Sequence, residues 1–119
     1  MVWFNIMAIF YKNQGFVLST TNLTTVLTIN TSSVAIVKDI AVTNDSSTAA
    51  ELDMYIYDSS ATTNYQFLHA SIPGLCNGNA AQTVLNLEEG DAILAQTPTV
   101  DVIKGVISYA LLDRTGENG

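Results

Sequence analysis

The chain has 119 residues, a length that suits one globular domain with a single hydrophobic core. Hydrophobic residues make up 48% of it, which is too many for a disordered chain. The formal net charge is −7 with only four lysines and arginines, so the sequence lacks the basic surface that nucleic-acid binding needs, and an anionic membrane surface is disfavoured as a partner. No apolar run approaches the roughly 20 residues of a membrane-spanning helix.

The first eleven residues carry a high density of large apolar side chains. These side chains are Trp3, Phe4, Ile6, Ile9, Phe10 and Tyr11. Two interpretations stay open: the segment is the first strand of the domain's own sheet, or it is an arm that docks on another subunit. The polar residues 12–15 favour a flexible break after it. We therefore divide the chain into an N-terminal segment, residues 1–14, and a single β-sandwich domain, residues 15–119.

The rest of the chain reads as a series of short strands. The expected strands are 25–29, 34–43, 51–57, 65–72, 82–87, 91–95 and 100–112. Residues 51–57 alternate regularly, with Leu52, Met54 and Ile56 on one face, and this period of two is typical of a half-buried strand. The same interpretation of residues 34–43 puts Lys38 on an apolar face whose other members are Val34, Ile36, Ile40 and Val42.

Residues with turn chemistry separate these strands, for example at 44–47, 73–74 and 89–91. Short strands at this spacing predict an all-β fold, an antiparallel two-sheet β-sandwich of seven or eight strands. The pattern does not separate a jelly-roll from an immunoglobulin-like topology.

The residues that could carry chemistry are few. One cysteine, Cys76 in the loop 75–78, excludes an intramolecular disulfide, and one histidine, His69, excludes a zinc site of the usual kind. We interpret His69 as a strand histidine that is exposed or hydrogen-bonded, and the acidic residues around Gly90 as solvated turn residues. The glycines are dispersed, so no phosphate-binding loop is present. We expect no enzyme activity, no catalytic residues, no metal and no cofactor.

Tyr55 and Tyr57 share the polar face of the strand 51–57. Adjacent exposed aromatic rings could form a platform for stacking sugars, which makes a carbohydrate-binding module the alternative from another functional class. We favour the interpretation that these rings pack against a neighbouring strand or subunit.

The order of the strand motifs resembles a known family, the small β-sandwich accessory proteins encoded among the structural genes of tailed bacteriophages, cyanobacterial phages especially. The matching segments are 24–29, 35–44, 54–60, 71–73, 85–93 and 106–109. The most recognisable is Leu85-Asn86-Leu87-Glu88-Glu89-Gly90-Asp91-Ala92-Ile93. The chain departs from the pattern at Asn30, where a proline is common, and in the loop 75–78.

The resemblance implies a non-enzymatic structural protein of the virion that is assembled in the host cytoplasm. It would decorate or cement the capsid, or serve at the neck or tail. Its partners would be copies of itself, for example in a trimer, and major capsid or neck and tail proteins. We expect the apolar residues of the N-terminal segment, together with Tyr55 and Tyr57, to bind these partners.

Overall fold

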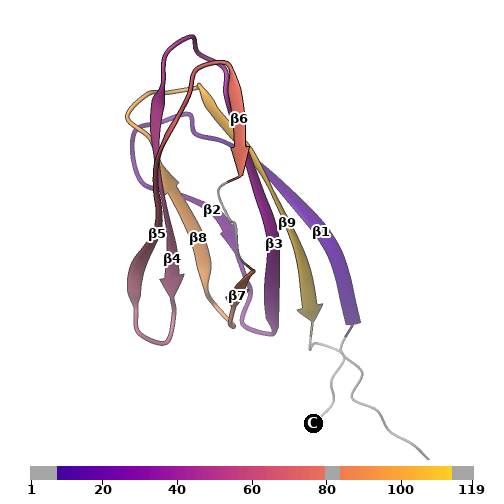
Figure 1. The fold of residues 1–119 in the computed structure, drawn as a ribbon. Coiled ribbons are helices and arrows are strands. Elements are labelled where there is room, and N and C mark those ends of the chain that lie inside the picture. The colour runs from indigo at the N-terminus through magenta and orange to yellow at the C-terminus, as the bar shows by residue number, and fades with distance from the viewer. Residues whose placement is uncertain (1–7, 80–83, 114–119) are drawn as a thin grey trace, which may run out of the picture.

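The computed structural model describes residues 8–79 and 84–113, and every regular element in them is a β-strand (Figure 1). The strands are β1 (Ala8–Val17), β2 (Thr24–Thr28), β3 (Ser33–Asn44), β4 (Ala50–Asp58), β5 (Thr63–Ile72), β6 (Cys76–Asn79), β7 (Leu85–Leu87), β8 (Ala92–Gln96) and β9 (Ile103–Asp113). These ranges contain no helix, and so none that could cross a membrane. The expected loop at 75–78 is wrong from Cys76 onward, because β6 begins there.

The strands form two antiparallel sheets packed face to face (Figure 1). The first sheet has the order β1-β9-β3, and the far edge of β3 is paired by β6 over residues 41–44 and by β7 over residues 35–37. β6 and β7 thus act as one interrupted edge strand. The second sheet has the order β2-β8-β4-β5. The predicted two-sheet β-sandwich is confirmed, with eight strands when β6 and β7 are counted together.

The pairing pattern selects the jelly-roll topology. With β6 and β7 as one strand, the first strand pairs the last, the second pairs the next to last, and so on inward: β1 with β9, β2 with β8, β3 with β6 and β7, and β4 with β5. Such nested pairs are those of one long hairpin folded over itself. The pairing of β9 with β3 completes the first sheet, and the pairing of β8 with β4 completes the second. An immunoglobulin-like sandwich keeps its first two strands in one sheet, whereas here β1 and β2 lie in opposite sheets.

The core lies between the sheets, and β4 contributes to it as predicted, with Leu52 and Met54 fully buried. The predicted face of β3 is wrong in its first half. Ala35 and Val37 are buried there, whereas Val34 is half-buried and Ile36 is 38% exposed. The pairing of β3 with β9 shifts register between Val37 and Asp39. This bulge adds one residue, Lys38, so the inward positions change from odd to even numbers and the lysine stays out of the core.

A buried carboxylate joins two turns at one end of the sandwich. Asp91, which begins the segment leading into β8, is 4% exposed, so the expectation of a solvated turn residue is wrong for it. Its Oδ1 accepts hydrogen bonds from the Ser59 backbone N–H at 2.9 Å and the Ser59 hydroxyl at 3.0 Å. Its Oδ2 accepts from the Glu88 backbone N–H at 2.8 Å. The β4–β5 turn is therefore fixed to the β7–β8 turn.

Candidate docking surface and polar groove

The outer face of the first sheet carries rows of apolar side chains across three strands. Residues directly opposite one another in an antiparallel sheet project from the same face. The register places Ile9, Leu112 and Val34 in one row, and Tyr11, Ala110 and Ile36 in the next. Near the N-terminal end of β9, Val106 lies between Gly15 of β1 and Ala41 of β3. We call the set formed by Ile9, Tyr11, Val34, Ile36, Val106, Ala110 and Leu112 the apolar face.

Several of these side chains are open to solvent. The exposed fraction is 56% for Ile9, 77% for Tyr11 and 44% for Val106. Ala110 is only 8% exposed, because the larger side chains of Tyr11 and Ile36 flank it. The ammonium of Lys38, the bulge residue, lies 5.2 Å from the centroid of the Tyr11 ring. The first two rows are adjacent, whereas Val106 lies beyond the polar row Asn13–Ser108–Asp39. Exposed apolar surface of this kind is typical of a contact with another protein.

The eight residues expected to bind partners do not lie on one surface. Ile9 and Tyr11 lie on the apolar face, and Phe10 projects from the opposite side of β1, 45% exposed. Tyr55 and Tyr57 lie half-buried on the outer face of the second sheet. Trp3, Phe4 and Ile6 fall outside the described residues.

Residues 12–15, where a flexible break was expected, pair with β9 inside the continuous strand β1. Residues 8–14 of the N-terminal segment thus belong to a strand of the first sheet, and the arm interpretation stays a prediction for the residues before them. Sequence analysis missed Val34, Ile36, Val106, Ala110 and Leu112 as surface residues. The signal that could have revealed the first two is Lys38, because a lysine inside an alternating apolar pattern is compatible with a bulge.

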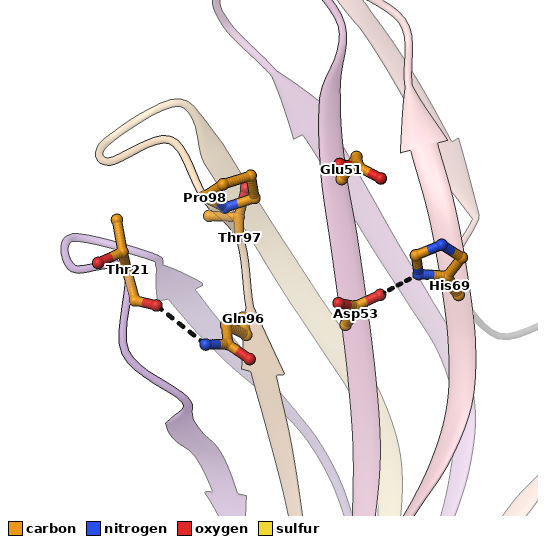
Figure 2. Close-up of a pocket in the computed structure, with 7 residues that line it drawn as sticks. All are labelled: Thr21, Glu51, Asp53, His69, Gln96, Thr97 and Pro98. Atoms are coloured by element: carbon orange, nitrogen blue, oxygen red, sulfur yellow. Dashed lines mark hydrogen bonds and ion pairs between the residues drawn. The ribbon is translucent and has the colours of Figure 1, made fainter.

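A polar groove lies on the outer face of the second sheet (Figure 2). It has a volume of about 580 Å³ and is lined by Thr21, Glu51, Asp53, His69, Gln96, Thr97 and Pro98. Glu51 and Asp53 lie two residues apart on β4, with His69 on the neighbouring β5 and Gln96 at the end of β8. The Gln96 side-chain amide donates to the Thr21 carbonyl at 3.1 Å, which connects β8 to the β1–β2 loop.

An ion pair fixes the carboxylate in this groove. Asp53 Oδ1 is bonded to His69 Nδ1 and also accepts a hydrogen bond from the Gln66 side-chain amide at 3.1 Å. The hydrogen bond that His69 donates to Asp53 raises the pKa of His69 above 6.5, and the negative charges of Asp53 and Glu51 act in the same direction. His69 is exposed and hydrogen-bonded on a strand, as the sequence indicated.

A second group of carboxylates, Asp58, Glu88 and Asp91, has oxygens within 4.8 Å of one another. Asp58 accepts bonds from the backbone and hydroxyl of Ser60, at 3.0 and 2.7 Å. Both oxygens of Asp91 accept bonds from the protein, as described above. The hydrogen bonds of Asp58 and Asp91 hold the β4–β5 and β7–β8 turns, which accounts for the closeness of these carboxylates. We assign no ion to this group.

No family model matches the chain, and no curated protein matches it. A solved structure does: a chain in the acidic stable capsid structure of Helicobacter pylori bacteriophage KHP30 has the same fold, with a TM-score of 0.54. The likeness covers 90% of this chain and 89% of that chain, at 12% sequence identity. At this identity the likeness shows the fold alone.

Proposed function

We propose that this chain is a non-enzymatic structural protein of a tailed-bacteriophage virion, and that it decorates or cements the capsid. It acts by associating with copies of itself and docking on major capsid subunits. The observation that carries the proposal is the apolar face, which a solitary monomer leaves in water. The fold shared with a chain of a phage capsid structure supports it.

The charge distribution supports a contact at this face. Copies of a chain with a net charge of −7 repel one another unless their contact surfaces exclude carboxylates. The two rows Ile9–Leu112–Val34 and Tyr11–Ala110–Ile36 contain none. Interface cores are depleted in charged residues and enriched in aromatic ones, and Tyr11 at the open edge fits this composition.

The N-terminal sequence before β1 carries further large apolar side chains. Residues 1–7 include Trp3, Phe4 and Ile6, and they precede the strand whose first outward residue is Ile9. We propose that these three side chains add to the contact with a neighbouring subunit. A role at the neck or tail would use the same face against a different partner. The narrower likeness to accessory proteins of cyanobacterial phages stays a prediction.

The experiment is a particle-binding assay with the full chain. Purified particles that lack the protein are incubated with it, and sedimentation measures the bound fraction. We expect saturable binding to the capsid. The variant Ile36→Ser should bind more weakly, whereas the control Tyr65→Ser, on the second sheet, should bind as the wild type does. Binding to isolated tails alone would select the neck or tail role, and binding to neither would refute the proposal.

A further inference from the structure

Two tyrosines of β4, Tyr55 and Tyr57, follow the polar groove along the outer face of the second sheet. Asp53, Tyr55 and Tyr57 project from the same outer face at every second residue, roughly 7 Å apart along the strand. The pairing of β4 with β8 has no register shift from Asp53 to Tyr57, so this row is straight. Leu94 lies opposite Tyr55, and Ala92 lies opposite Tyr57. The outer face therefore presents hydrogen-bonding groups at one end of β4 and aromatic rings beside them.

We propose that this surface binds a neutral oligosaccharide laid along β4. Tyr55 and Tyr57 stack against sugar rings, and the groove carboxylates accept hydrogen bonds from sugar hydroxyls. Tyrosine suits this task because its ring offers an apolar face while its hydroxyl stays wet. A ligand site needs few polar groups when they are well placed, and the groove volume lies within the range of small-ligand sites.

The charges of the groove select the class of sugar. Glu51 and Asp53 put two carboxylates beside one imidazole, that of His69, in a chain whose net charge is already −7. An anionic glycan or a phosphate would meet repulsion there, whereas neutral hydroxyls meet acceptors that form strong, charge-assisted hydrogen bonds. His69 acts as a positioning residue, because its ring nitrogen holds Asp53 in one orientation. The site does not depend on the proposed virion role.

The test is an NMR titration of the isotope-labelled full chain with defined sugars. The neutral probes are maltotriose, cellotriose and tri-N-acetylchitotriose, and 3′-sialyllactose is the anionic comparison. We expect at least one neutral probe to bind and to shift the amides of β4, β5 and β8 around Asp53 and Tyr55. Binding of the anionic probe alone, no binding, or shifts confined to the first sheet would overturn the proposal.

Matched variants separate stacking from folding. Tyr55→Ala should weaken binding of the neutral probe about tenfold, while Tyr55→Phe, which keeps the ring, should bind as the wild type does. Ile36→Ser on the opposite sheet is the control and should bind the sugar normally. Undiminished binding by Tyr55→Ala would contradict the assignment. If either Tyr55 variant lost self-association and still bound sugar normally, the assignment would also be contradicted, because the tyrosines would then pack against a subunit.

Discussion

Replacing Ile9 and Ile36 together by threonine should weaken self-association without unfolding the protein. Fully burying an isoleucine side chain contributes about 1.5–3 kcal/mol. Ile36 is 38% exposed and Ile9 is 56% exposed, so covering the exposed parts would contribute about 0.6–1.1 and about 0.8–1.7 kcal/mol, respectively. Together these amounts correspond to an association constant about ten to a hundred times lower. Threonine keeps the β-branched shape that suits a strand.

The covered parts of the two side chains also stabilise the monomer, so the free energy of unfolding should fall by at most about 3 kcal/mol. Sedimentation velocity over a range of protein concentrations measures the association constant, and circular dichroism checks that the variant is folded. Tyr65→Thr is the matched control, because Tyr65 is 55% exposed but lies on the second sheet. Equal weakening by the control, or unchanged association of the double variant, would refute the role of the apolar face.

Four further predictions follow from single features. Asp91→Asn should lower the free energy of unfolding by about 1–3 kcal/mol in urea titrations, because the amide cannot accept at both ends; an unchanged value would contradict the turn-joining role. The single imidazole of His69 should titrate by NMR with a pKa above 6.5, returning toward 6.5 in Asp53→Asn. Because this pKa is raised in the folded state, the ion pair should stabilise the fold while His69 is protonated, and the difference in Tm between wild type and Asp53→Asn should shrink as the pH rises through the folded-state pKa of His69; a difference that grows with pH would be the wrong sign. Cys76→Ser, at an exposed position, should change stability by no more than about 0.5 kcal/mol. Deleting residues 1–6 should reduce association while Tm stays constant; a large drop in Tm would assign the segment to the fold of the monomer.

The parts of the fold that depend on local pattern were predictable from the sequence. Residues 51–57 alternate without interruption because β4 pairs with β8 without a register shift, so Leu52 and Met54 were placed in the core correctly. The first half of β3 was misassigned because the bulge at Lys38 depends on the register with β9, which is distant in sequence. One extra residue exchanged the inner and outer positions, and this exchange moved Ile36 onto the surface.

The candidate sites were less predictable, because long-range pairing assembles them. The apolar face needs β1 and β9, from opposite ends of the chain, to lie side by side. The groove brings Asp53 and His69 together with Gln96 and Thr21, from four separate segments. Sequence analysis selected Tyr55 and Tyr57 correctly as a pair on one face, since that relation is local, but it could not place the groove next to them. The choice of jelly-roll topology likewise depends on which strands pair.

The most direct test of the proposed virion role is the copy number of this chain in purified virus particles from cells that express it. Quantitative mass spectrometry of particles purified by density gradient would measure it against the major capsid protein. We expect a fixed ratio, with the chain present in many copies that stay with the capsid when tails are removed. A chain abundant in infected cells but absent from purified particles would contradict a structural role in the virion.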